Sequence, residues 1–265
     1  MNYGFIGLGN MATAIIKGMA ASKKFDTNHL YGMNRSYEKT DELVQQYGIQ
    51  GCTTIEELMK KVDVVVLAVK PQVLSSILPT VKAFLRKNQI VISIAAGKSL
   101  AYLQEQLDGH PSIFRVMPNI NAIIGASTSC YSTPASTSNA HKQLIEEMFE
   151  TIGTIVELPE NLFSIFTTIG CASPAFTYLY IDSLARAAVR EGMPKEMALE
   201  IAASSVLGSA KMILESKEHP MALVDQVCSP GGTTIQGVTS LQANRFEGVI
   251  HDAVMAVTRK DHSLQ

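Results

Sequence analysis

The stretch "YGFIGLGNMA", residues 3–12, decides the fold of this chain. A short apolar run leads into the pattern G-x-G-x-x-A, which is formed by Gly7, Gly9 and Ala12. Gly7 is expected to allow a tight turn, Gly9 to let a pyrophosphate approach the backbone, and Ala12 to let the next helix pack closely on the strand. The same predicted cofactor-binding turn includes Leu8, Asn10 and Met11. The pattern is meaningful only where it closes the first strand of a βαβ unit.

The surrounding sequence supplies that context by alternating short apolar runs with amphipathic helical patterns. Strands are predicted at 3–8, 29–33, 62–69, 89–96 and 112–117, and helices at about 10–22, 37–47, 54–60, 72–86 and 99–107. Nearly continuous Val/Ile/Leu runs indicate strands that are covered on both faces. The prediction is therefore an α/β fold with a Rossmann-type, doubly wound, mostly parallel sheet. Segments 125–132, 136–150 and 153–158 complete or edge that sheet.

The character of the sequence changes after residue 158. Strand signals vanish, and helical patterns follow with Pro174, Pro194 and Pro220 near the expected helix starts. We therefore expect a dinucleotide-binding domain at 1–158 and an all-α domain at 159–265. The helix at 174–189 is apolar around most of its circumference. A small domain cannot surround such a helix, which predicts a homodimer or a larger homo-oligomer formed through the helical domain.

Composition and charge exclude several classes of protein. The net charge is −2 and the sequence pI is about 6.3, so neither nucleic acid nor an anionic membrane is an expected partner. The histidines are scattered and the four cysteines form no C-x-x-C pair, so no metal site is expected. The start "MNYGFIGLGN" does not resemble a signal peptide, and no uninterrupted apolar run is long enough to span a membrane. A cytoplasmic location with reduced thiols is the expectation.

The predicted strand ends indicate which dinucleotide binds. After the second strand the chain reads Asn34-Arg35-Ser36, where an NAD-binding protein usually has an acidic residue. A guanidinium, an amide and a hydroxyl suit a 2′-phosphate, so NADPH is preferred over NADH, although a solvated Arg35 is the alternative. Three further strand ends are predicted to line the same cleft: Ala68, Val69, Lys70 and Pro71; Ala95, Ala96 and Gly97; Pro118 and Asn119. Bound NADPH there implies hydride transfer.

A second unusual stretch is "CSPGGTTIQGVTSL", residues 228–241, in the helical part. Two glycines and two threonines precede a resumed helical pattern. An uncovered helix start offers unpaired N–H groups and a partial positive charge, which suits a small anion. The alternative is a capped turn between two core helices.

The chain resembles the pyrroline-5-carboxylate reductase family in "GFIGLGNMA", "NRS", "AVKPQ", "SIAAG", "RVMPN" and "SPGGTT", which occur in this order between about residues 3 and 260. The resemblance implies NADPH- or NADH-dependent reduction of 1-pyrroline-5-carboxylate to L-proline, the last step of proline synthesis. It also implies a helical domain that interlocks with a partner. The family's substrate loop corresponds to Ser229, Pro230, Gly231, Gly232, Thr233 and Thr234. The backbone there would hold the substrate carboxylate, and the Thr234 hydroxyl would meet the ring nitrogen as the catalytic contact.

One segment departs from the family pattern. Where the family commonly has "SGSGPA", this chain reads "GCASPA" at 170–175, so Cys171 and Ser173 replace permissive glycines. Local packing there is the feature this change puts in question.

Two other functions are open at this stage. A different NADP-dependent imine reductase, or a dehydrogenase of the 3-hydroxyacid or 6-phosphogluconate type, has a similar architecture. The dehydrogenases need a base at the start of the helical domain, and residues 161–180 contain no Lys, Arg or His. A non-catalytic NADP-sensing protein would bind NADPH without turning over an imine. Since the matched motifs offer no general acid, we expect an already protonated imine to be reduced by positioning alone.

Overall fold

The computed structural model describes residues 1–263, and the chain divides into two compact units. The sheet unit consists of Met1–Cys171 together with the C-terminal residues from Lys260, and the helical unit is Ala172–Arg259. The sheet unit thus continues past residue 158, where the sequence indicated a boundary. Phe163 and Phe166 explain this extension, because both are buried in a cluster with Met117 and Cys130 of the sheet.

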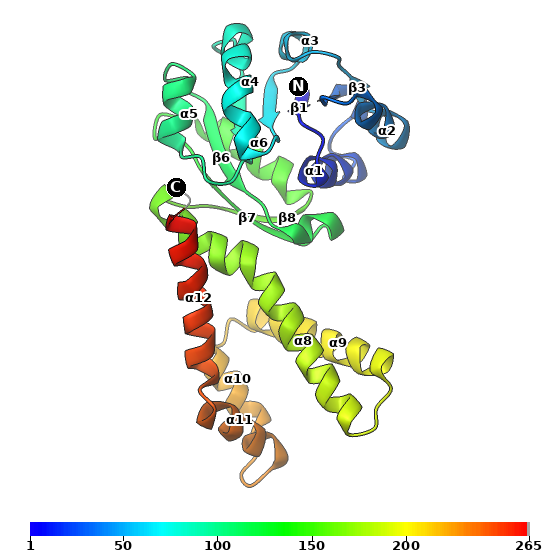
Figure 1. Cartoon of the computed structure of the whole chain (residues 1–265), viewed down its shortest axis with the longest axis vertical. Coiled ribbons are helices and arrows are strands. Elements are labelled where there is room, and N and C mark those ends of the chain that lie inside the picture. The colour runs from blue at the N-terminus through cyan, green and yellow to red at the C-terminus, as the bar shows by residue number, and fades with distance from the viewer. Residues whose placement is uncertain (264–265) are drawn as a thin grey trace. The chain divides into compact units, whose positions relative to one another are not determined.

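The sheet unit is built on an eight-stranded sheet in the order β3-β2-β1-β4-β5-β6-β7-β8 (Figure 1). The strands are β1 (Tyr3–Ile6), β2 (Leu30–Met33), β3 (Gln50–Gly51), β4 (Val64–Leu67), β5 (Ile90–Ser93), β6 (Ile113–Met117), β7 (Ser127–Ser132) and β8 (Gly153–Glu157). Every pairing is parallel except that of β6 with β7. The predicted doubly wound, mostly parallel sheet is confirmed, and β3 is a strand that the sequence did not predict.

Helices cover both faces of this sheet and create two cores. They are α1 (Asn10–Ala21), α2 (Tyr37–Tyr47), α3 (Ile55–Lys61), α4 (Pro71–Phe84), α5 (Leu100–Gln106) and α6 (Asn139–Glu150). Val64 and Val66 of β4 point into the core that includes α1 and α6, while Val65 and Leu67 point into the core formed with α3, α4 and α5. All four side chains are fully buried, which is why the strand is an uninterrupted apolar run.

A helical connection leads out of the sheet unit. A short 3₁₀ turn (Glu160–Leu162), α7 (Phe163–Phe166) and a π-helical segment (Thr167–Ala172) precede the helical unit. The helical unit then contains α8 (Ser173–Arg190), α9 (Lys195–Ser216), α10 (Pro220–Val227), α11 (Thr233–Ala243) and most of α12 (Phe246–His262). The absence of predicted strands after residue 158 is confirmed for the residues that the structure describes.

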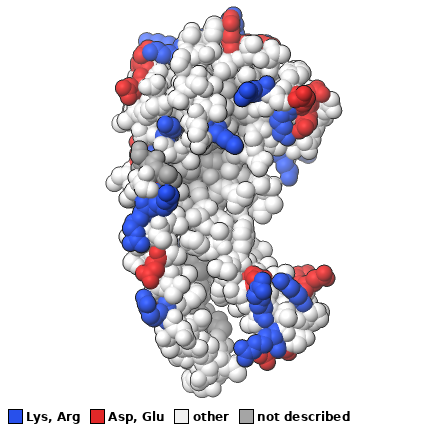
Figure 2. Space-filling model, viewed as in Figure 1, with Lys and Arg blue, Asp and Glu red and all other residues white. Residues whose placement is uncertain are grey.

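The long helices of the helical unit leave much apolar surface uncovered. Leu179 of α8 is 69% exposed, and Leu207 and Leu214 of α9 are 71% and 78% exposed. Figure 2 shows charged side chains near the α8–α9 turn and a row of them along α12, with mostly uncharged surface between these two places. By length and composition alone, 160–190 and 195–216 could each cross a membrane, and only 33% and 11% of their most apolar windows are buried. This chain by itself does not cover these helices.

Candidate cofactor and substrate sites

The predicted cofactor residues gather at one edge of the sheet. β2, β1, β4, β5 and β6 are neighbours and run parallel, so their carboxyl ends meet at the same edge. The strand order reverses between β1 and β4, and ligands of open α/β sheets bind in the crevice at such a reversal. The predicted cofactor contacts all lie in the loops after these five strands or in the first residues of the helices that follow: Gly7–Ala12, Asn34–Ser36, Ala68–Pro71, Ala95–Gly97 and Pro118–Asn119.

The two glycines of the first loop have different structural requirements. Gly7 has φ +95°, and a Cβ there would lie 2.8 Å from the Ala68 carbonyl oxygen, so only glycine fits. Gly9 has φ −73°, and a Cβ built on it would have no atom within 4 Å. Gly9 also starts α1 without a side-chain cap. Its missing side chain therefore leaves room beside free first-turn N–H groups, which fits a pyrophosphate.

The loop after β2 holds the predicted 2′-phosphate residues. The Asn34 side-chain oxygen accepts a hydrogen bond from the Leu8 N–H at 3.3 Å, which ties this loop to the glycine turn. Arg35 is exposed, and its guanidinium makes no ion pair with any residue up to 263. The Ser36 hydroxyl donates to the carboxylate of Glu38, in the first turn of α2. The loop thus presents a free cation, and beside it an acid that sequence reasoning missed.

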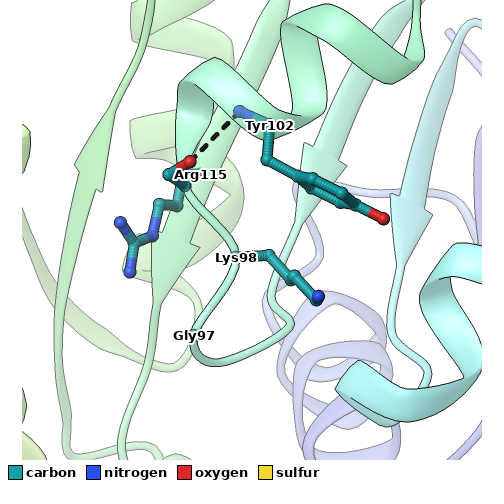
Figure 3. Close-up of a pocket in the computed structure, with 5 residues that line it drawn as sticks. Gly97, Lys98, Tyr102 and Arg115 are labelled. Atoms are coloured by element: carbon teal, nitrogen blue, oxygen red, sulfur yellow. Dashed lines mark hydrogen bonds between the residues drawn. The ribbon is translucent and has the colours of Figure 1, made fainter. Parts of the chain in front are cut away.

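The ends of β4 and β5 form the middle of this edge. Lys70 is exposed at the start of α4, which has Pro71 as its first residue and no side-chain cap. Gly97 has φ +70° and lines a small pocket of about 150 Å³ with Lys98, Ser99, Tyr102 and Arg115 (Figure 3). The Lys98 ammonium lies 4.7 Å from the centre of the Tyr102 ring. Figure 3 shows these two side chains on one side of the Gly97 turn and the Arg115 guanidinium on the other.

The Arg115 guanidinium is buried and paired within the protein, so its role is structural. Its side chain is 7% exposed, and one guanidinium nitrogen donates to the Glu160 carboxylate at 2.7 Å. The guanidinium also lies over the Phe163 ring, 4.4 Å from its centre. Arg115 therefore ties the end of the sheet to the segment that leads toward the helical unit.

The end of β6 carries Pro118 and Asn119, both buried. The Asn119 amide donates to the Gly170 carbonyl at 2.7 Å, and its oxygen accepts from the Asn121 N–H at 3.1 Å. Its side chain is thus committed to holding the π-helical segment, which gives Asn119 a positioning role at this edge. Nothing in the sequence pattern pointed to this tie.

The departure at Cys171 is accommodated by packing. Its thiol donates a weak hydrogen bond to the Pro118 carbonyl oxygen, with the sulfur 3.7 Å away, and the side chain packs on the cluster around Phe163. Burial raises the pKa of the Cys171 thiol to about 11 and that of Cys130 to about 12. Both thiols are protonated at neutral pH and are not nucleophiles. None of the four cysteines forms a disulfide, and no metal-binding cluster occurs within residues 1–263.

The predicted substrate loop is a tight turn that opens a helix. The Gly232 N–H donates to the Ser229 carbonyl at 3.0 Å, with Pro230 and Gly231 between them and Gly231 at φ +70°. These are the residues and the backbone sign of a type II turn. A Cβ on Gly232 would collide with the Ser229 side chain and lie 3.1 Å from its carbonyl oxygen. The left-handed backbone of Gly231 therefore requires glycine, whereas at the extended Gly232 a side chain would have to displace the Ser229 hydroxyl.

The helix that follows has an open start. α11 begins at Thr233 with Gly232 as its N-cap residue and no side-chain cap, so the alternative of a side-chain-capped turn is not what the structure has. Thr233 and Thr234 are exposed. Thr234 also lines a mainly apolar cavity of about 730 Å³ within the helical unit, beside Cys228 and Tyr180. Free backbone donors thus lie next to an apolar wall, an arrangement suited to a small carboxylate with an apolar body.

Two family models match this chain, one in each of its two parts. Residues 160–264 match the family model described as pyrroline-5-carboxylate reductase dimerisation, and residues 2–97 match the model described as NADP oxidoreductase coenzyme F420-dependent. The pyrroline-5-carboxylate reductase of Arabidopsis thaliana is 36% identical over 261 residues, which is 98% of this chain and 94% of the relative. This chain belongs to the pyrroline-5-carboxylate reductase family.

Two solved structures of family members agree with this assignment along the whole chain. The pyrroline-5-carboxylate reductase of Coxiella burnetii has a TM-score of 0.94 at 30% identity, covering 100% of this chain and 98% of that one. The pyrroline carboxylate reductase of Plasmodium falciparum, solved with NADP bound, has a TM-score of 0.87 at 29% identity, with the same coverage. The family resemblance seen in the motifs is confirmed.

Proposed function

We propose that this chain reduces 1-pyrroline-5-carboxylate to L-proline with NADPH, as the last step of proline synthesis. The observation that carries the proposal is the uncapped start of α11 behind the Ser229–Gly232 turn. It occurs in a chain of this family that also has a glycine turn with room for a pyrophosphate beside Gly9. The reaction consumes the imine, NADPH and one proton, and it yields proline and NADP⁺.

The cofactor is proposed to bind along the carboxyl edge of the sheet unit. The first turn of α1 would hold the pyrophosphate, and Arg35, Asn34 and Ser36 would meet the 2′-phosphate. Residues 68–71 and 95–97 would line the remainder, with 118–119 closing that edge. When bound, NADPH supplies the hydride from its nicotinamide ring. NADH is an acceptable second cofactor under this proposal.

The substrate is proposed to bind on the turn. Its carboxylate would accept hydrogen bonds from the N–H groups at Gly231, Thr233 and Thr234, because the N–H of Gly232 already closes the turn, and the hydroxyls of Ser229 and Thr233 would assist. The Thr234 hydroxyl would accept a hydrogen bond from the protonated ring nitrogen. Since an aliphatic hydroxyl is a very weak acid and stays protonated near neutral pH, Thr234 orients the ring and does not act as an acid.

The turn contains none of the four side chains that most often act as general acids. Residues 228–234 read "CSPGGTT", without His, Lys, Asp or Glu. A protonated imine needs none, because hydride addition to its carbon leaves a neutral amine. Catalysis by positioning follows, with the chain holding the imine carbon and the hydride donor in register.

The assembly is proposed to be a homodimer formed through the helical unit, in the cytoplasm. The exposed leucines of α8 and α9 support this, because a second copy of the same surface would remove them from water. A model describing a dimerisation domain matches this part of the chain. Cofactor binding is proposed for residues 1–158, and substrate binding for residues 159–265.

The test measures NADPH oxidation with 1-pyrroline-5-carboxylate and with 1-pyrroline. A reverse assay measures NADP⁺ reduction with 3-hydroxyacids. We expect turnover of the carboxylated imine and at least a hundredfold lower kcat/KM for 1-pyrroline, because the turn then has no anion to hold. Equal rates with both imines would favour the general imine reductase alternative. Turnover of a 3-hydroxyacid, or NADPH binding without turnover of any imine, would refute the proposal.

A further inference from the structure

An acidic side chain, that of Glu38, lies beside the predicted 2′-phosphate site. Glu38 is the second residue of α2 and is exposed, and its carboxylate accepts a hydrogen bond from the Ser36 hydroxyl. Ser36 is the N-cap residue of α2, yet its side chain does not cap the helix. Serine is among the preferred N-cap residues, so its hydroxyl has been drawn from the backbone to Glu38.

This arrangement brings two opposite charges to one ligand position. Arg35 is exposed and makes no ion pair with the residues described, so it can attract a phosphate. Glu38 holds the hydroxyl that the same phosphate would use. The hydroxyl has one proton and serves one acceptor at a time, so a phosphate would compete with Glu38 for it. Each acceptor lies about 2.7 Å from the same oxygen, so the two anions would be within about 5 Å of each other. An incoming 2′-phosphate would therefore meet a carboxylate at close range.

The same carboxylate suits the other dinucleotide. Proteins that select NAD place an acid at the end of the second strand to accept from the ribose 2′-hydroxyl. Sequence position alone indicated that this chain lacks such an acid, because Asn34, Arg35 and Ser36 occupy the loop. The Ser36 contact shows that Glu38 reaches the loop from the first turn of α2.

We propose that Glu38 is the specificity-determining residue that keeps NADH usable by opposing the 2′-phosphate of NADPH. The inference rests on the proposed function, and in particular on cofactor binding at this edge. A phosphate with nearly two negative charges, at about 5 Å from a carboxylate in water, is bound about tenfold more weakly at low ionic strength. The 2′-hydroxyl of NADH suffers no such repulsion.

The test measures binding by isothermal titration calorimetry with NADP⁺ and NAD⁺, at 25 and 500 mM salt, with no turnover involved. Glu38→Gln should tighten NADP⁺ binding about tenfold at low salt and change NAD⁺ binding less than threefold. The gain should shrink at high salt, because screening weakens the repulsion. Glu38→Asp keeps the charge and should leave the ratio of the two dissociation constants within twofold of the wild type.

A matched control removes one charge elsewhere on the same helix. The Asp41 carboxylate accepts a hydrogen bond from Gln45, whereas the Ser36 hydroxyl donates to Glu38, so Asp41→Asn should leave the ratio of the two dissociation constants unchanged. The inference would be overturned if Glu38→Gln shifted the ratio of the NADP⁺ and NAD⁺ dissociation constants by less than twofold. It would be overturned equally if Asp41→Asn shifted this ratio as much as Glu38→Gln does. In that case the wild type still binds both dinucleotides, and the proposed function stands. Failure of the wild type to bind either dinucleotide would overturn both.

Discussion

Gly9→Ala should separate cofactor binding from folding, whereas Gly7→Ala should damage both. Gly9 has φ −73° and ψ −179°, which alanine adopts freely, and an added Cβ would meet no atom within 4 Å. The expected change in the free energy of unfolding is within about 1 kcal/mol, since alanine restricts the unfolded chain but is a poorer N-cap residue.

The same methyl group should cost much of the cofactor affinity. It would occupy the space beside the first-turn N–H groups of α1, where the pyrophosphate is proposed to lie. Losing one charge-assisted hydrogen bond costs about 1.5–3 kcal/mol, so the dissociation constant for NADP⁺ should rise about 10- to 150-fold.

Gly7→Ala is the contrasting variant. Its φ of +95° is unfavourable for alanine, and the Cβ would lie 2.8 Å from the Ala68 carbonyl oxygen and 2.9 Å from a Val69 methyl carbon. A left-handed backbone costs about 1–2 kcal/mol and an overpacked core about 1–3 kcal/mol, so unfolding should become about 2–5 kcal/mol easier.

Calorimetric titration with NADP⁺ and urea unfolding followed by circular dichroism would measure both quantities for each variant. The chain has no tryptophan, so the far-ultraviolet signal is the suitable probe. The reasoning would be refuted if Gly9→Ala bound NADP⁺ like the wild type. It would be refuted equally if Gly9→Ala lost as much stability as Gly7→Ala.

Three further perturbations test other parts of the molecule. Thr234→Ala should lower kcat about 10- to 100-fold with little change in NADPH affinity. The control is Thr239→Ala, which should change neither quantity, because the Thr239 hydroxyl donates to carbonyls of its own helix. Parallel losses of kcat and NADPH affinity in Thr234→Ala would contradict the assignment. Leu207→Glu on α9 should convert the proposed dimer to single chains in size-exclusion chromatography, and an unchanged elution volume would argue against that surface as the interface. The pKa of Glu57 is lowered to about 2 by hydrogen bonds from Lys61 and a backbone N–H. The ionised Glu57 carboxylate stabilises the fold fully above its ordinary pKa near 4.5, and this stabilisation is lost as pH falls through 2. Glu57→Gln should therefore lower Tm at pH 7 but not at pH 2. An equal drop in Tm at both pH values would show that the ionised carboxylate is not the source of the stabilisation.

The sheet was largely predictable because its strands are buried on both faces. Val64–Leu67 alternate between the two cores and are all fully buried, so no polar residue interrupts the run. The glycine turn was predictable for a related reason, since Gly7 sits where no other residue fits. In both places the local sequence is dictated by steric requirements that leave a visible pattern.

Other features depend on contacts that no local pattern encodes. β3 is only Gln50–Gly51, and it is a strand because it pairs with β2. The antiparallel direction of β7 follows from its short connection to β6, since a parallel return needs a longer crossover. The tie from Asn119 to Gly170 and the contact from Ser36 to Glu38 each join groups whose meeting depends on the fold. For these features the sequence names the residues but not their partners.

The helix starts of this chain explain why its two proposed sites look alike. Side-chain caps cover the starts of α3, α5, α6 and α10, from Thr54, Ser99, Ser138 and His219. α7 and α8 continue from preceding helical turns, and α9 begins at Pro194 without a cap. Four further starts without a side-chain cap lie at the proposed sites: those of α1, α2, α4 and α11, at Gly9, Ser36, Lys70 and Gly232. A missing cap costs about 1 kcal/mol, so leaving these four starts open has a price unless another group supplies the acceptor. Three of them follow β1, β2 and β4, at and beside the reversal of the strand order, and the fourth follows the proposed carboxylate turn. Anions that bind there would take the place of the missing caps. α2 is the informative case, because its N-cap residue could close the helix and donates to Glu38 instead.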